Sequence, residues 1–259
     1  MRRARRPCRR AIERTQAMRP CAVVPVKRFT QAKQRLHARC DDALRHALAR
    51  AMLEDVLDAL AAARGLAGVL LVTADAEAAG LARRRGMDVL EEAQPGGLNA
   101  AVTAAARHLR ALGRRAMLVV PADAPGVSVA EIEHLGSVHA QRGDAVTLVP
   151  SHDHGGTNAL LLDPPDAMAP AFGPDSFHRH LRRAHAAGLA TSVLELPGLG
   201  LDLDHPHDLQ RFVATPSDTR TRRLLQAHTF LPGSAGMPRP PARPALPRVH
   251  HLLPARTAP

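Results

Sequence analysis

The sequence predicts an α/β domain with a mostly parallel central sheet. Short apolar runs alternate with segments of helical periodicity from residue 18 to residue 216. This alternation is typical of strand–helix–strand units, whose parallel strands are covered by helices on both faces. The core has to be built from Leu, Val and Ala, because the chain has no Trp, no Tyr and only five Phe. About 200 residues are enough for one such domain.

The expected elements follow one another in a regular order. The first strand is the apolar run at residues 21–26, and Asp41 and Asp42 precede a helix over residues 43–63 with apolar residues at helical spacing. Further strands are expected at residues 68–74, 87–90, 116–120, 145–150, 158–162 and 192–196. Further helices are expected at residues 76–85, 97–112, 129–140, 176–187 and 207–213.

The formal net charge of +11 resides at the two ends of the chain. Residues 1–17 contain seven Arg and one acidic residue, residues 217–259 contain the same numbers, and residues 18–216 are nearly neutral. We therefore expect a disordered basic extension over 1–17, an ordered domain over 18–216 and a disordered Pro- and Arg-rich tail over 217–259. Met18 is a candidate for the natural start of translation.

The composition also bears on the class of protein. No stretch approaches the ~20 apolar residues of a membrane helix, and no apolar segment follows the Arg-rich start as in a secretory signal. Three cysteines without metal-ligand spacing favour reduced thiols and a cytoplasmic location. The scarcity of aromatic residues argues against binding to single-stranded nucleic acid. The alternative to an enzyme is a nucleic-acid binder that uses its basic ends, whose salt-sensitive binding would disappear when both ends are deleted.

A basic loop follows the first expected strand, at the edge where parallel sheets bind ligands. It contains Pro25, Lys27, Lys33 and Arg35, and its two Lys are the only Lys among 35 basic residues. This usage suggests that a compact ammonium group is required there. Several cations in one loop suit a triphosphate, although the GxxxxGK[ST] loop of many nucleotide-binding proteins is absent. The alternative is a solvated basic loop.

A glycine pair precedes the helix expected at residues 97–112. Gly96 and Gly97 would let a ligand approach backbone amides at the start of that helix. Asn99 offers a donor and an acceptor to the edge of a base. The alternative is an ordinary turn with Asn in the first helical turn.

Small polar residues mark a second candidate pocket. Thr157 precedes an apolar strand, and Gly173 and Ser176 precede the helix at 176–187. Hydroxyls and glycine amides in such positions suit the phosphate or carboxylate of a small acid. The alternative is that Ser176 or Asp175 simply caps its helix.

Three aspartates are candidate metal ligands. Asp123 follows a buried strand, and Asp202 and Asp204 would point to the same side of an extended segment. Mg²⁺ is bound by one or two carboxylates together with phosphate oxygens. The alternative is that these residues stabilise turns and cap the last helix.

The histidines occur partly in pairs. His152 and His154, His178 and His180, and His205 and His207 raise the question of zinc. The pairs lie in different elements, and no Cys or Glu accompanies them at zinc spacing, so the sequence disfavours this reading. We instead expect His152 and His154 to line the acid pocket.

The order of these motifs resembles one family. The segments are VPVKRFTQAKQRL, GGLNAA, PADAP, GGTNALLL, FGPDSFHRH and LDLDHPHDL. Together they resemble the guanylyltransferases of coenzyme F420 biosynthesis, which use 2-phospho-L-lactate, phosphoenolpyruvate or 3-phospho-D-glycerate. The similarity extends over residues 20–213 and implies a three-layer nucleotidyltransferase-like fold. One departure is His205, where the family commonly has Thr.

The resemblance implies a role for each group of residues. The basic loop would hold the phosphates of GTP, with Lys27, Lys33 and Asp123 as catalytic groups, and the glycine pair with Asn99 would lie against guanine. Asp123, together with Asp202 or Asp204, would bind Mg²⁺. The phosphorylated acid would be held by Thr157, Gly173 and Ser176.

The implied reaction needs no strong general base. A phosphate oxygen of the acid would attack the α-phosphorus of GTP, and pyrophosphate would leave, so that positioning and charge neutralisation carry the catalysis. Hand-over of the product to the next transferase of the pathway, and a homodimer, are compatible with this role. The alternative enzyme is a nucleotidyltransferase of the molybdenum-cofactor type. The absence of a Gly-rich first loop argues against this alternative.

Overall fold

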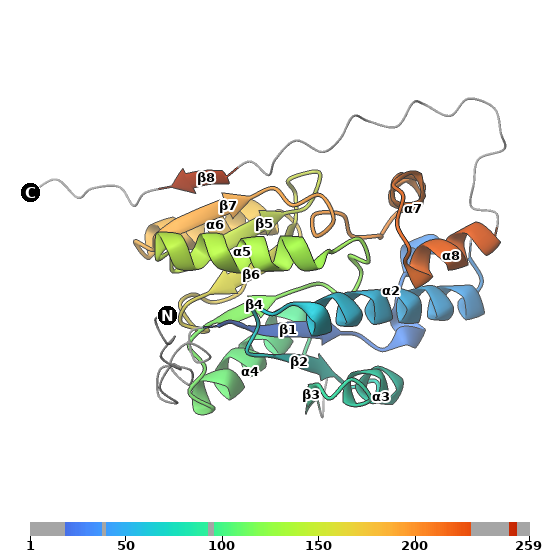
Figure 1. Ribbon diagram of the computed structural model, residues 1–259, viewed down its shortest axis with the longest axis horizontal. Helices are drawn as coiled ribbons and strands as arrows, with labels where there is room; N and C mark the ends of the chain where they lie inside the picture. Colours follow the sequence, from blue (N-terminus) through green and yellow to red (C-terminus); the bar gives the residue numbers. More distant parts are fainter. Residues whose placement is uncertain (1–18, 38–39, 93–95, 229–248, 253–259) are drawn as a thin grey trace, which may run out of the picture.

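A computed structural model of the chain describes residues 19–37, 40–92, 96–228 and 249–252. These residues form one eight-stranded mixed sheet with the order β3-β2-β1-β4-β6-β5-β7-β8 (Figure 1). The strands are β1 (Cys21–Val26), β2 (Gly68–Thr73), β3 (Asp88–Glu91), β4 (Met117–Val119), β5 (Val146–Pro150), β6 (Thr157–Leu162), β7 (Thr191–Leu194) and β8 (Val249–Leu252).

The directions of the strands decide which loops meet. Strands β1 to β4 are mutually parallel, β5 is parallel to β7, and β6 runs antiparallel between β4 and β5. The carboxyl ends of β1, β4, β5 and β7 therefore lie at the same edge of the sheet as the amino end of β6. The predicted mostly parallel α/β sheet is confirmed, and its loops are gathered where such sheets bind ligands.

Helices cover both faces of the sheet (Figure 1). One face packs against α2, α3, α5, α7 and α8, and the other against α4 and α6. The helices are α2 (Asp42–Ala62), α3 (Ala76–Arg83), α4 (Leu98–Ala111), α5 (Val129–Arg142), α6 (Ser176–Ala186), α7 (Pro206–Ala214) and α8 (Arg220–Ala227). The three layers match the architecture that the family resemblance implies.

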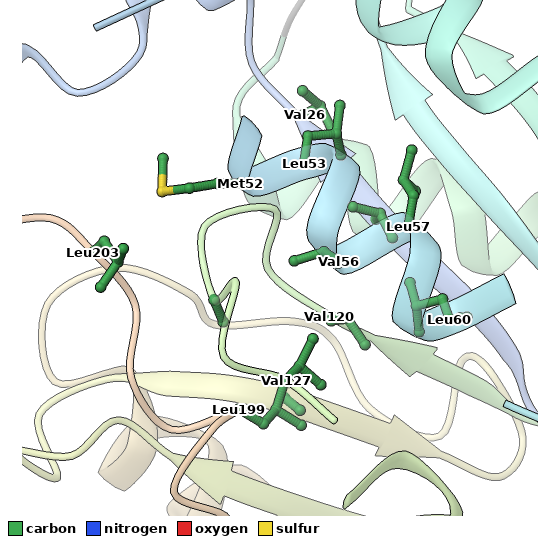
Figure 2. Close-up of a cluster of buried hydrophobic side chains, with 14 of the residues drawn as sticks. Val26, Met52, Leu53, Val56, Leu57, Leu60, Val120, Val127, Leu199 and Leu203 are labelled. Atoms are coloured by element: carbon green, nitrogen blue, oxygen red, sulfur yellow. The ribbon is translucent and has the colours of Figure 1, made fainter. Parts of the chain in front are cut away.

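Alternation along the buried strands produces two cores. In β1, Ala22 and Val24 face the side of α2, whereas Cys21 and Val23 face the side of α4, as the pleat of a strand requires. Each fully buried Leu or Val stabilises the fold by about 1.5–3 kcal/mol relative to an exposed one. Figure 2 shows the first core, where side chains of α2 gather with residues that follow β4 and β7.

The starts of two helices illustrate how sequence fixes them. The Asp41 carboxylate accepts a hydrogen bond from Leu44 N at 2.8 Å, so the predicted cap of α2 is confirmed. Ser128 and Glu131 form a capping box at the start of α5. These local contacts set where the loops that approach the carboxyl edge begin and end.

The predicted disorder from residue 217 onward is wrong for residues 220–227. They form α8, whose Leu225 is buried against α2 and whose Thr221 donates to the buried Asp55 of α2 through both its backbone N–H (2.9 Å) and its hydroxyl (2.7 Å). Residues 249–252 also pair with β7 as strand β8. The predicted extension over 1–17 and the rest of the predicted tail lie outside the described residues. Among the described helices, none is long and apolar enough to cross a membrane.

Candidate functional site

Three aspartates converge at the carboxyl edge of the sheet. Asp123 follows β4, and Asp202 and Asp204 lie in the segment between β7 and α7. The two segments are joined because Leu203 N donates to the carbonyl oxygen of Asp123 at 3.0 Å. Asn158, at the start of β6, donates to the Asp202 carboxylate at 3.1 Å. The structure therefore brings together all three predicted metal ligands.

Lys33 lies among these carboxylates. Its Nζ donates to Asp123 Oδ2 at 2.7 Å and to Asp204 Oδ1 at 2.8 Å, and its side chain is only 5% exposed. Burial opposes the charge of this ammonium group, but the two carboxylates outweigh burial and raise its pKa above the ordinary value. Lys33 is thus a permanent cation at the centre of the site.

The cluster still carries excess negative charge. Burial, followed by the charge of Asp123, raises the pKa of Asp202, and no described cation forms an ion pair with its carboxylate. Burial also acts to raise the pKa of Asp204, but the neighbouring Lys33 lowers it overall. Three carboxylates against one buried ammonium group fit a divalent cation, and oxygen ligands are those that Mg²⁺ prefers.

The remaining residues of the basic loop are placed differently. Lys27 is exposed directly after β1 and contacts no charged group among the described residues. Arg35 Nη1 lies 3.4 Å from Asp204 Oδ2 at the surface, and Pro25 is part of β1. Phe29 is buried and its backbone N–H donates to Asp75, which anchors the loop against α3. With Arg28, which is also exposed, the loop thus presents one buried and three exposed cations at the edge of the sheet.

The predicted base-reading amide has another partner. Asn99 Nδ2 donates to the carbonyl oxygen of Phe172 at 3.0 Å, and its Oδ1 accepts from Phe172 N at 2.8 Å. Both hydrogen-bonding groups of this side chain therefore join α4 to the segment before α6, and in this structure neither is directed to a ligand. Gly96 is exposed and Gly97, with φ +83°, begins α4, so the glycine pair does open a helix.

The three predicted acid-binding residues are neighbours. Thr157 N donates to Ser176 Oγ at 2.8 Å, and Ser176 N donates to the carbonyl oxygen of Gly173 at 3.1 Å. Gly173 has φ +121°, a conformation that favours glycine. The start of β6 and the start of α6 thus form one polar corner at the same edge as the aspartates.

Sequence reasoning considered His180 only as a zinc ligand and missed that it supports the polar corner through Thr157. Its Nε2 accepts from Ala171 N at 2.8 Å, so its Nδ1 carries the proton and donates to Thr157 Oγ1 at 2.9 Å. Burial, with Arg183 and Arg179 nearby, lowers the pKa of His180 to about 4. The spacing of Ser176 and His180 by four residues on one helix was the available signal.

Arg179 was also missed. It is half-buried in the first turn of α6, and its Nη1 would lie 3.8 Å from a methyl group placed on Gly173. It forms no ion pair with a described residue. A guanidinium without a carboxylate partner beside the polar corner is suited to an anionic ligand.

The structure separates the two histidines that we expected to line the acid pocket. His154 packs edge-on against Phe177 at the start of α6, with ring centroids 6.0 Å apart. His152 instead turns toward Asp208 and His207 of α7. The two side chains therefore belong to different surroundings.

A three-layer fold with carboxylates and cations at the carboxyl edge of a mostly parallel sheet defines a nucleotidyltransferase-like protein. The fold resembles that of a nucleotidyl transferase from Methanothermobacter thermautotrophicus (TM-score 0.53, 18% identity, 81% of this chain and 99% of the other). It also resembles a protein from Desulfovibrio desulfuricans G20 assigned to the nucleotide-diphospho-sugar transferases (TM-score 0.65, 20% identity, 80% and 94%). These similarities establish the fold.

Sequence comparison identifies the family. The family profile described as "Guanylyl transferase CofC like" matches residues 20–232. The phosphoenolpyruvate guanylyltransferase of Conexibacter woesei is 40% identical over 208 residues, which are 80% of this chain and 92% of the relative. The 2-phospho-L-lactate guanylyltransferase of Methanothermobacter thermautotrophicus is 36% identical over 213 residues, 82% and 92%. The chain belongs to the CofC guanylyltransferase family and is a nucleotidyltransferase enzyme.

Proposed function

We propose that this enzyme transfers GMP from GTP to a phosphorylated three-carbon acid and releases pyrophosphate, as a step of coenzyme F420 biosynthesis. The candidate acids are phosphoenolpyruvate, 3-phospho-D-glycerate and 2-phospho-L-lactate, for which members of the family are named. The observation that carries the proposal is the juxtaposition of the aspartate–Lys33 cluster with the polar corner of Thr157, Gly173 and Ser176 at one edge of the sheet.

The two halves of this edge would hold the two substrates. Lys27, free in solvent after β1, and Arg35 would contact the triphosphate, with Pro25, Gly96 and Gly97 at the base and ribose side. Asn99 would lie on the same side and position α4 there through its two hydrogen bonds to Phe172. Thr157, Ser176 and Arg179 would bind the acid through its phosphate or carboxylate, since hydroxyls and a guanidinium are donors suited to oxyanions. The acid then lies next to the aspartate cluster.

The reaction is an in-line substitution at phosphorus. An oxygen of the acid's phosphate forms a bond to the α-phosphorus of GTP, and the bond from that phosphorus to the bridging oxygen of pyrophosphate breaks. The nucleophile is already anionic, so the residues need only position it and offset negative charge. Mg²⁺ bound at Asp123 with Asp202 or Asp204 would neutralise charge on the phosphate oxygens. Lys33 keeps two of these carboxylates in place.

The identity of the metal as Mg²⁺, a cytoplasmic location, a homodimer and direct hand-over to the downstream pathway transferase are parts of the same proposal. The metal rests on the all-oxygen ligand set. The cytoplasmic location rests on the three cysteines, which lack metal-ligand spacing and favour reduced thiols, and the dimer and the hand-over rest on the family resemblance.

The direct test uses Asp123→Asn. The variant keeps the size of the side chain but removes the charge that faces Lys33 and the metal, so we expect GTP- and Mg²⁺-dependent pyrophosphate release to fall by about 100-fold or more. Asp218→Asn, at an exposed position just before α8, is the matched control and should be as active as wild type. Undiminished release in Asp123→Asn would remove this residue from the site.

The acceptor is tested by one panel of assays. GTP and Mg²⁺ are supplied with each of the three acids in turn, and the guanylylated product is followed directly, with the downstream transferase added to trap an unstable product. Formation of an adduct with one acid identifies the substrate. If none of the three acids supports pyrophosphate release, the proposed class of acceptor is contradicted. The assignment of the nucleotidyltransferase fold would be unaffected.

A further inference from the structure

A second group of metal-ligand side chains lies beside the aspartate cluster and has no part in the proposed reaction. It consists of His152, in the turn after β5, and His207 and Asp208, in the first turn of α7. One potential ligand atom of each residue lies within 4.8 Å of the others. His207 Nε2 is 3.2 Å and His152 Nε2 is 3.8 Å from Asp208 Oδ1.

Asp208 has one carboxylate oxygen in use and one without a hydrogen bond. Its Oδ2 accepts from His205 N at 2.7 Å and from Asp204 N at 3.1 Å, which caps α7. Its Oδ1 accepts no hydrogen bond from any described residue and cannot be hydrated freely, because Asp208 is only 2% exposed. A carboxylate oxygen removed from water without a hydrogen bond is costly, so a cation at this oxygen would stabilise the fold.

A protonated histidine would also supply a positive charge beside Asp208 Oδ1, but it would satisfy only one of the two rings. A charged His207 would pair with Asp208 Oδ1, from which its Nε2 is already 3.2 Å away, but His152, whose Nε2 is 3.8 Å from the same oxygen, would then have no partner of its own there. A metal ion satisfies both imidazoles and the carboxylate at once. Ligand atoms at about 2.0–2.2 Å from a tetrahedral zinc ion are themselves roughly 3.3–3.6 Å apart, close to the separations of 3.2 and 3.8 Å.

We propose that His152, His207 and Asp208 form a binding site for Zn²⁺ or a similar transition-metal ion, separate from the Mg²⁺ site. Two imidazoles and one carboxylate favour such ions over Mg²⁺, which prefers oxygen ligands. Three protein ligands leave a fourth position for water. His207 is 68% exposed, so an ion can enter from solvent.

The position of the site indicates its effect. His152 N donates to the carbonyl oxygen of Gly200 at 2.8 Å, which joins the turn after β5 to the segment of Asp202, and the ion would fasten the same turn to the start of α7. Asp208 holds the backbone of Asp204 through its other oxygen. The bound ion therefore stabilises the loops that carry the reaction without touching the substrates.

Cobalt titration of the full-length chain tests the proposal. Co²⁺ in a tetrahedral site with imidazole ligands absorbs visible light much more strongly than octahedral Co²⁺, so the titration is carried out with excess Mg²⁺ to fill the oxygen site. We expect one equivalent of strongly absorbing Co²⁺ that Zn²⁺ displaces, together with a rise in melting temperature. His207→Gln, at an exposed position, should weaken this binding by more than about ten-fold and abolish the melting shift.

Two further variants separate this site from other causes. His154→Gln removes an exposed histidine nearby and should leave the absorption unchanged, which controls for adventitious binding to the 15 histidines of the chain. Asp123→Asn should also leave it unchanged, even if that variant is inactive. Absence of strong absorption in the wild-type chain, or full absorption in His207→Gln, overturns the proposal and leaves the proposed guanylyltransferase function intact.

Discussion

At the scale of single residues, Lys33 explains why lysine survives in an arginine-rich chain. Its Nζ is held at 2.7 and 2.8 Å by two carboxylates in a buried position. A compact ammonium group fits between them, whereas a guanidinium is planar, wider and needs more space. Lys27, the other lysine, is exposed and free to contact a ligand. The two lysines of the basic loop therefore meet different requirements: Lys33 fits a buried site between carboxylates, and Lys27 is available to a ligand.

Exchange of each lysine for arginine tests this difference. Lys33→Arg overpacks a buried site, so we expect a loss of about 1–3 kcal/mol in the free energy of unfolding and a strong fall in turnover. Lys27→Arg should impair turnover while the unfolding midpoint stays as in wild type, because its side chain is in solvent. Urea denaturation and pyrophosphate release are measured on both. Equal behaviour of the two variants would refute the distinction.

Other residues of the site show where sequence reasoning ends. The predicted ligands Asp123, Asp202 and Asp204 meet because strand ends meet, which a parallel sheet dictates. The partner of Asn99 is Phe172, 73 residues away, and the support of Thr157 is His180, 23 residues away. Such pairings depend on how α4 and α6 pack on the sheet; the spacing of Ser176 and His180 places both on one face of a helix but does not identify Thr157 as the partner.

At the scale of elements, two loops that carry the aspartates touch through glycines. A methyl group on Gly198, in the segment after β7, would lie 2.1 Å from the carbonyl oxygen of Gly126, in the segment after β4. The Gly198 N–H also donates to Glu131 of α5 at 2.7 Å. This close approach of two backbones holds the Asp202 segment against the Asp123 segment.

Alanine at two glycines provides a matched test of that contact. Gly198→Ala must push backbone apart, and we expect it to destabilise the fold by about 1–3 kcal/mol and to lower turnover. Gly136→Ala, in the middle of α5 with nothing within 4 Å of the added methyl group, should stabilise it by about 0.5–1 kcal/mol. Both are read from urea unfolding curves. A neutral Gly198→Ala would show that the loops are not in contact.

Most elements could be predicted because their signals are local. The first strand matches residue for residue, and the helix expected at 129–140 is α5 at Val129–Arg142. Helix α8 escaped prediction because its composition is polar and its stabilising partner is Asp55 of α2, 166 residues from Thr221. The strand order, with β6 between β4 and β5, likewise arises from long-range pairing.

At the scale of the whole molecule, the net charge of +11 says little about the site, which is a cluster of three carboxylates that one buried lysine neutralises only in part. The response to acid is a more informative global property. Burial lowers the pKa of both His180 and His139, and both are therefore neutral in the folded protein at neutral pH. The raised pKa of Asp202 acts in the opposite direction, since its neutral form is favoured in the folded state.

The lowered pKa of His180 predicts that the folded protein loses stability as the pH falls. His180 has a pKa of about 4 when folded against an ordinary value of 6.5, so below pH 6.5 the unfolded chain binds the proton first and stability declines until about pH 4. Between pH 7.5 and pH 5 this one group removes about 2 kcal/mol from the free energy of unfolding. Urea denaturation at the two pH values, with chelator present, measures the change.

Two glutamine variants isolate the contribution of His180. His180→Gln is less stable than wild type at pH 7.5, because it breaks the bonds to Ala171 and Thr157, but its further loss on going to pH 5 should be smaller by about 2 kcal/mol. His178→Gln, two residues earlier on the same helix and 53% exposed, should keep the full wild-type dependence. If His180→Gln loses as much stability on acidification as wild type, another group is responsible, and the neutral, Thr157-directed tautomer of His180 loses its support.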